Sequence, residues 1–247
     1  MKMLRICSLL LLLVFLANGI SAQTVVSDAS IGQTSCTGTP SVCDYHFSAT
    51  VTAGNTLVMG ISNGNGLTAI TSVTDQNGNS YTVVQPQHLP LFGPWTLGGA
   101  YACNLDTHVS ATLLLHVTWT SGTPTGSTVR YAEISGGCVD QKGVATVSNT
   151  GTAGTNFTGG NFTTTSANEM IFSDVICDNG TPAVGSGFTL IQGSLALNGK
   201  QEQKTVTSIG TYAANWTSSA NSDDAAVLTM TIKSASAAPV RHRSGVM

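Results

Sequence analysis

The chain has 247 residues, of which 41% are hydrophobic and only 9% are charged, and its formal net charge is −3. Average soluble proteins carry roughly 25% charged residues, so this composition excludes an acidic or basic disordered tail and a coiled coil. Nine Lys and Arg against twelve Asp and Glu leave no basic surface for nucleic acid. Threonine occurs 35 times and serine 26 times; because threonine favours strands over helices, the composition indicates an all-β protein.

The first 22 residues are organised like an export signal. Lys2 and Arg5 form a short positive segment, an apolar run follows over Ile6–Ala17, and Ile20-Ser21-Ala22 offers a small-residue cleavage site. The apolar run is shorter than the roughly 20 residues of a membrane span. We therefore expect residues 1–22 to be a cleaved signal peptide. The mature protein is then secreted, either extracellular or periplasmic, with no membrane span.

Five cysteines remain after the expected cleavage. Cys36 and Cys43 bracket a turn-rich loop that can bring them together, so a disulfide between them is predicted. Cys103, Cys138 and Cys177 allow one further pair in three ways. Of these we prefer Cys138 with Cys177, because both lie at or near predicted strand ends, which leaves Cys103 as a buried thiol.

From Gln23 onward the chain repeats short runs of alternating polarity separated by Gly, Asn, Asp or Pro, which is the pattern of β-strands. The Asn77-Gly78 pair between two β-prone runs predicts a hairpin. No window keeps a helical apolar period for three turns. Strands are predicted over 45–52, 57–61, 81–84, 113–119, 128–135, 169–178, 187–192, 204–210 and 225–233.

About a dozen short strands in a chain of this length fit two packed antiparallel sheets. We predict a single β-sandwich domain over residues 23–234, with a jelly-roll or immunoglobulin-like arrangement. The Gly- and Thr-rich stretch Gly151–Thr165 is expected to be a long surface connection. Residues 235–247 are expected to be a flexible tail.

Metal and cofactor motifs are missing from the sequence. The five histidines are scattered singly, and neither H-E-x-x-H nor C-x-x-C occurs, so no metal and no cofactor are predicted. Asp75, Asn77 and Asn79 alternate as in a calcium loop, but the required Gly is displaced and the Glu at the twelfth position is missing. Turn chemistry explains these three side chains.

Two carboxylates are unusual because they lie on apolar strand faces. Glu133 shares its predicted face with Val129 and Tyr131, and Asp174 shares one with Phe172 and Ile176. A buried acid must be hydrogen-bonded or have a raised pKa. A structural role, bonding backbone groups or Arg130 across the sheet, is the expectation, and Glu133 and Asp174 are the catalytic candidates if the protein is an enzyme.

The segment Gln85–Trp95 is the loop with the strongest functional signal. Three prolines stiffen it, and it carries more apolar side chains than a solvent-exposed loop needs. Phe92 and Trp95, with His88 beside them, could stack on a sugar ring or bury into a partner. The alternative is that these residues cap one end of the sandwich core.

Several strand-and-turn segments together form a recognisable succession: Ala53–Val58, Ser72–Asp75, Gly78–Thr82, Tyr131–Gly136, Gly210–Tyr212 with Trp216, and Ala226–Lys233. In these segments the chain resembles a group of largely uncharacterised bacterial secreted β-sandwich proteins. The resemblance implies an extracellular or cell-surface protein, often next to adhesion or carbohydrate-related domains, with no agreed catalytic residues.

Export, β architecture and missing catalytic motifs together favour a secreted, non-enzymatic module for extracellular binding or surface structure. Its expected partner is a glycan or an extracellular protein, recognised through loops at one end of the sandwich. One alternative is a carbohydrate-active enzyme on a jelly-roll scaffold. The other alternative is a subunit of an extracellular fibre or surface layer.

Overall fold

The structure is a computed structural model that describes residues 23–33, 35–38, 41–66, 69–89, 93–148, 154–193, 199–222 and 224–234. Within these ranges every regular element is a β-strand, which confirms the all-β class. The predicted signal peptide, residues 1–22, and the predicted tail, residues 235–247, lie outside the described residues.

The first half of the chain forms two antiparallel sheets, named A and B here. Sheet A contains, in spatial order, β1 (Thr24–Gly32), β9 (Thr128–Ser135), β4 (Thr56–Asn63), β7 (Thr96–Ala102) and β6 (Thr82–His88). Sheet B contains β2 (Ser35–Thr37), β3 (Val42–Thr50), β8 (Thr112–Trp119) and β5 (Ile70–Asp75). Alternating side chains such as Met59, Tyr45 and Trp119 bury the core between these two sheets.

The second half forms two more antiparallel sheets, C and D. Sheet C contains β10 (Cys138–Ser148), β17 (Asp224–Lys233), β12 (Glu169–Cys177), β15 (Lys200–Val206) and β14 (Thr189–Gly193). Sheet D contains β11 (Gly154–Thr163), β16 (Thr211–Ser222) and β13 (Pro182–Ala183). Phe157, Val175, Trp216 and Val227 are buried in the core between them.

The two halves have the same strand order. If β2 is set aside, each half has eight strands, and counting within each half gives the order 1-8-3-6-5 in sheets A and C and 2-7-4 in sheets B and D. An immunoglobulin domain would instead place strands 1, 2, 5 and 4 in one sheet. The described strands therefore form two jelly-roll units, which we name unit 1 (β1–β9) and unit 2 (β10–β17).

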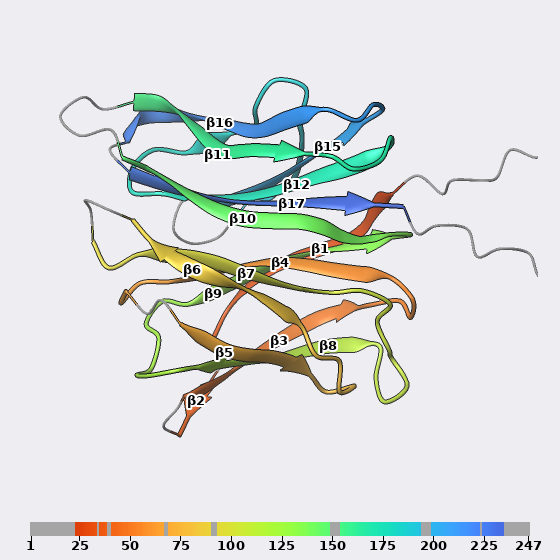
Figure 1. Cartoon of the computed structure of the whole chain (residues 1–247). Coiled ribbons are helices and arrows are strands. Elements are labelled where there is room, and N and C mark those ends of the chain that lie inside the picture. Colours follow the sequence, from red (N-terminus) through yellow and green to blue (C-terminus); the bar gives the residue numbers. More distant parts are fainter. Residues whose placement is uncertain are drawn as a thin grey trace, which may run out of the picture.

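The four sheets lie in layers in the order D, C, A, B (Figure 1). Side chains such as Val58 and Leu97 from sheet A and Phe172 and Leu228 from sheet C fill a third core between the units. The sandwich class is confirmed, but it is built from four sheets and not from the two that the sequence suggests. The single-domain span 23–234 stays a prediction.

The units meet through reciprocal strand contacts. β6 of unit 1 contacts β10 of unit 2, and β1 of unit 1 contacts β14 of unit 2; in both cases strand 5 of one unit meets strand 1 of the other. The third strands, β4 and β12, contact each other. These reciprocal contacts around one self-contact indicate an approximate two-fold relation within one chain, which the contacts of β7 with β10 and β17 do not follow.

Residue contacts at the centre support this relation. Gly99 of β7 lies so close to β17 that a side chain at position 99 would meet Leu228. In the reciprocal place, the Gln201 side chain of β15 donates from Nε2 to the backbone oxygen of Arg130 in β9 at 3.0 Å. The strand registers then align the two units residue by residue. Equivalent positions are Gly60 and Asp174, Gly99 and Gln201, and Arg130 and Leu228.

The disulfides differ in part from the prediction. Cys36 pairs with Cys43 as expected. The second bridge joins Cys103 to Cys138, and Cys177 is a buried thiol outside both bridges, so the preferred Cys138–Cys177 pair is wrong. Cys177 cannot reach Cys138 because the two lie at opposite ends of sheet C, where Cys138 pairs with Lys233 and Cys177 with Ala225 of β17. The Cys103–Cys138 bridge links the end of β7 in unit 1 to the start of unit 2.

The predicted connection over 151–165 is also wrong. Residues 154–163 form β11, which pairs with β16 across two register shifts, one of them at Gly159-Gly160. Glycine and asparagine weaken the strand signal of this segment, but its Phe157 alternates with exposed Asn156 and Thr158 as strand residues do.

Candidate functional site

The predicted binding loop Gln85–Trp95 is a loop only in part, because Gln85–His88 belong to β6 and pair with β7, and Gly93–Trp95 lead into β7. Trp95 is half-buried, and its ring packs so closely on Gly64 that a side chain there would overlap it. It joins the core between sheets A and C. His88 is exposed, and Phe92 lies outside the described residues. Trp95 therefore packs as the capping alternative expects, and a binding role for this loop stays a prediction.

Glu133 is buried in β9 and fully hydrogen-bonded. Its Oε2 accepts a hydrogen bond from Ser27 Oγ at 2.6 Å. Its Oε1 accepts from the Thr52 backbone N–H at 2.8 Å and from Asn55 Nδ2 at 2.6 Å. These bonds tie β1 and the β3–β4 connection to β9, which fits the structural alternative.

Asp174 is buried in β12 and forms an ion pair with Arg130 of the facing sheet A. Arg130 donates to it from Nε at 2.9 Å and from Nη2 at 2.5 Å, and Gln201 Nε2 donates at 2.8 Å. Burial raises the pKa of Asp174, and the Arg130 guanidinium opposes that shift. This ion pair therefore connects the two units.

Glu133 and Asp174 do not form a carboxylate pair. Glu133 lies on the side of sheet A that faces sheet B, as do its face neighbours Val129 and Tyr131. Asp174 approaches sheet A from the opposite side. Two carboxyl groups separated by a sheet cannot act on one glycosidic bond.

The calcium-like segment is a turn. Asp75 Oδ1 accepts from the backbone N–H groups of Asn77 and Asn79 at 2.9 and 3.0 Å, and its Oδ2 accepts from Tyr81 Oη at 3.0 Å. Across the described ranges no three His, Cys, Asp or Glu side chains are grouped so that they could hold a metal ion. Nor do those ranges contain a helix long and apolar enough to cross a membrane.

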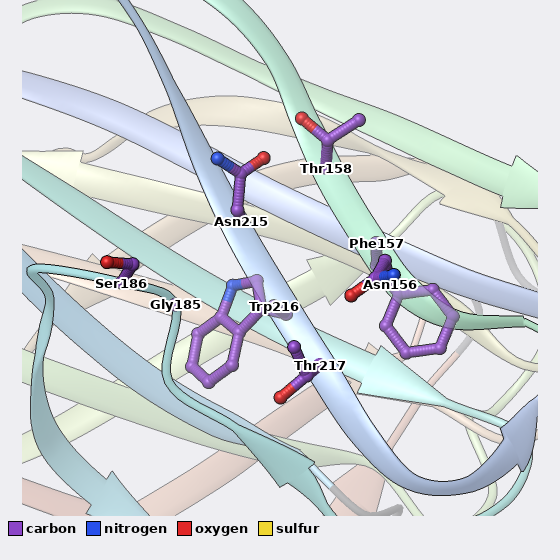
Figure 2. A pocket seen from close by; sticks show the side chains of 8 residues that line it. All are labelled: Asn156, Phe157, Thr158, Gly185, Ser186, Asn215, Trp216 and Thr217. Atoms are coloured by element: carbon purple, nitrogen blue, oxygen red, sulfur yellow. The ribbon is translucent and has the colours of Figure 1, made fainter.

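A pocket of about 420 Å³ lies on sheet D. β11 and β16 line it with Asn156, Phe157, Thr158, Asn215, Trp216 and Thr217, and the β13–β14 connection adds Gly185 and Ser186. In Figure 2 the Trp216 ring lies between β16 and the segment that carries Gly185 and Ser186. None of these lining residues is charged.

Strand alternation explains the chemistry of the pocket. Phe157 and Trp216 are paired across the strands and point into the core, whereas their neighbours point outward. The outward neighbours form two antiparallel pairs, Asn156 with Thr217 and Thr158 with Asn215. In the described part of the chain the side chains of Asn156, Thr158 and Asn215 make no hydrogen bond, and all are exposed.

Two side chains of sheet C, Ser173 and Glu202, accept hydrogen bonds from residues that line the pocket. Trp216 Nε1 donates to Ser173 Oγ at 3.0 Å, and the Gly185 backbone N–H donates to Glu202 Oε2 at 2.9 Å. Glu202 is fully buried, and its Oε1 has no hydrogen-bond partner among the described residues. Burial raises the pKa of Glu202 to about 8, although the Gly185 N–H and the Lys204 charge oppose that shift.

A second pocket, of about 490 Å³, lies where the start of β1 meets β14 and β15. Its lining is polar, includes Lys204 and contains no aromatic side chain. The pocket on sheet D has the more apolar lining, which is more typical of a ligand site, so it is the stronger candidate.

The sequence interpretation missed this pocket. Asn156 and Thr158 fall in the stretch taken for a connection, and Glu202 lies in the polar run Lys200–Lys204, which is typical of a surface. The alternation of Asn, aromatic and Thr in Asn156-Phe157-Thr158 and in Asn215-Trp216-Thr217 is the signal that could have found it.

Comparisons with known proteins add little to this picture. No family model matches the sequence, and no curated protein matches it. A solved structure that does match is the crystal structure of the major capsid protein P2 from Bacteriophage PM2. It has a TM-score of 0.30 and 9% sequence identity, and the match covers 89% of this chain and 100% of that one. At that TM-score the likeness carries no argument about fold or function.

Proposed function

We propose that this protein is an exported, non-enzymatic module that binds neutral carbohydrate through the pocket on sheet D. The observation that carries the proposal is the pair of uncharged Asn–Thr cross-strand pairs that line this pocket above Phe157 and Trp216. The two disulfides support the export half, because such bonds persist in oxidising compartments.

The lining chemistry suits a ligand rich in hydroxyl groups. Each Asn amide offers both donors and an acceptor, and each Thr hydroxyl can donate or accept. Because the side chains of Asn156, Thr158 and Asn215 have no partner in the described chain, binding need not break an internal hydrogen bond. The volume of about 420 Å³ lies in the usual range for small-ligand pockets.

The loop around Trp95 is a weaker location for the same function. Its indole is half-buried against Gly64 and the core between the units, and Phe92, the other aromatic residue of the loop, lies outside the described residues. The enzymatic alternative has no support in the contacts of Glu133 and Asp174, since both carboxyl groups are engaged in bonds that hold the fold.

A glycan array followed by calorimetry on each hit tests the proposal. The double variant Thr158→Ala/Asn215→Ala removes one of the two cross-strand pairs. We expect it to lower affinity by about tenfold or more, because two hydrogen bonds of about 0.5–1.5 kcal/mol each are lost. The matched control is Thr50→Ala/Thr112→Ala, an exposed cross-strand pair on sheet B, which should change affinity less than twofold.

Three results would count against this assignment. An array without any bound glycan overturns carbohydrate binding. Equal losses in the pocket variant and in the sheet B control show that the pocket is not the site. Loss of binding in Trp95→Ala, with the pocket variant unaffected, moves the site to the loop over 85–95.

A further inference from the structure

The two-fold relation between the units gives an internal comparison for the core behind the pocket. One row of three neighbouring residues crosses β7, β4 and β9 in unit 1, and the equivalent row crosses β15, β12 and β17 in unit 2. The strand registers align the two rows, and both face the interior of their sandwich. In unit 1 these positions are Ala100, Met59 and Tyr131, which belong to its core. In unit 2 they are Glu202, Ser173 and Thr229, and all three are buried.

The fold itself therefore does not require polar side chains at these positions. Unit 1 fills the same row with two apolar side chains and a tyrosine. In unit 2, Glu202 Oε1 and Thr229 Oγ1 are buried without a hydrogen-bond partner among the described residues. Because burying polar groups costs stability, Glu202 and Ser173, which occupy the positions of Ala100 and Met59 in unit 1, point to a role beyond filling the core.

Both lining elements of the pocket are attached to this row. Ser173 accepts the Trp216 indole N–H, and Glu202 accepts the Gly185 N–H. Gly185 lies so close to the Asn215 backbone that a side chain at position 185 would overlap the Asn215 carbonyl oxygen. The Glu202 bond thus fixes the distance between the β13–β14 connection and the strand that carries Asn215 and Trp216.

We propose that Glu202 is a positioning residue of this pocket: its carboxyl group accepts the Gly185 N–H and holds that segment against β16. For ligand affinity the inference rests on the proposed function, since a displaced segment would no longer line the carbohydrate pocket. Glu202 does not itself line the pocket, so it acts through Gly185.

The surroundings of Glu202 favour the neutral form. On its own strand, Lys204 is the charged group that acts on it, with Lys200 on the same strand face. Glu169 on β12 and Lys233 on β17 lie farther along the same side of sheet C, and Tyr212 is the titratable side chain of β16 on the inner face. β11 and the Gly185 segment bring no charge. An ionised Glu202 would have the Gly185 N–H as its only described donor.

Backbone and indole NMR shifts test this without any ligand. From pH 6 to 10 we expect the Gly185 amide and Trp216 Nε1–H signals of the wild type to shift together, with a midpoint near pH 8. Glu202→Gln keeps an oxygen that can accept from Gly185 but cannot ionise, so both signals should stay constant. Glu169→Gln is the matched control, because Glu169 is also buried and accepts backbone N–H groups, but from Thr165 and Ser166.

The wild-type titration alone can overturn the proposal: signals that stay constant through pH 8, or that titrate equally in Glu202→Gln, show that Glu202 does not position the segment. If a glycan binds, its dissociation constant should rise about tenfold in Glu202→Ala, which removes the acceptor of the Gly185 N–H, and less than twofold in Glu202→Gln, which keeps one. An array without hits defeats the carbohydrate proposal, but the NMR titration still decides the role of Glu202.

Discussion

Asp174 of β12 occupies the space that a side chain at position 60 of β4 would need. A Cβ added to Gly60 would overlap the Asp174 carboxyl group. The two positions are equivalent in the two units and lie where the third strands of sheets A and C cross. Unit 1 thus contributes a glycine and Arg130, and unit 2 contributes the carboxylate that fills the gap.

Gly60→Ala should therefore destabilise the protein strongly. The added methyl group displaces the Asp174 carboxylate from Arg130, so overpacking is added to the loss of a buried ion pair. We expect the free energy of unfolding in urea to fall by about 3 kcal/mol or more. Gly143→Ala in β10 is the control, because a Cβ there makes only ordinary contact with Phe162. Equal effects of the two variants would show that the central contact is not tight.

The Arg130–Asp174 pair should behave as a coupled unit. Arg130→Met leaves a buried carboxylate without its cation, and Asp174→Asn leaves a buried guanidinium, so each should cost about 3–5 kcal/mol. The double variant removes both charges and should cost less than the sum by about 2 kcal/mol or more. A double-mutant cycle in urea measures this difference, and single effects that simply add would contradict a direct interaction.

Local patterns in the sequence predict many of the strands but not how they are stacked. β9 and β17 are found within one residue of their bounds because alternating or continuous apolar runs mark them. The four layers arise from pairings such as β1 with β9 and β4 with β12, between residues far apart in the chain. β4 and β12 are buried on both faces, and their sequences do not show which strand of the other unit each one crosses.

The buried acidic residues near the candidate site were likewise predictable from the sequence only in part. The burial of Glu133 and Asp174 follows from the apolar residues on their strand faces. Glu202 is surrounded in sequence by Lys200, Gln201 and Lys204, so its burial depends on sheet D covering β15, which a local pattern cannot show. The Cys103–Cys138 bridge likewise depends on how the units are stacked.

Loss of the Cys103–Cys138 bridge should cost more than loss of Cys36–Cys43. The two bridges span 35 and 7 residues of sequence separation, and the chain-entropy relation gives about 4 and about 2.5 kcal/mol. Unfolding of the paired serine variants in urea compares them. Peptide mapping without reduction checks the connectivity, and a Cys138–Cys177 peptide would contradict the structure.

Glu202 should also make stability depend on pH. Burial raises its pKa in the folded protein to about 8 from the ordinary value of 4.5. Between these two values the folded state keeps a proton that the unfolded state has lost, so the stability of the wild type falls as pH rises. Below pH 4.5 both states are protonated, and above pH 8 both are ionised, so the dependence is confined to that window.

Glu202→Gln removes this titration and keeps the shape of the side chain. The difference in unfolding free energy between the variant and the wild type should grow in favour of the variant by about 1.4 kcal/mol per pH unit between pH 5 and 8. It should be small at pH 4 and constant above pH 9. Urea unfolding at five pH values measures the difference, with Glu169→Gln as the second buried glutamate. A difference that does not change with pH would show that Glu202 is ionised in the folded protein throughout.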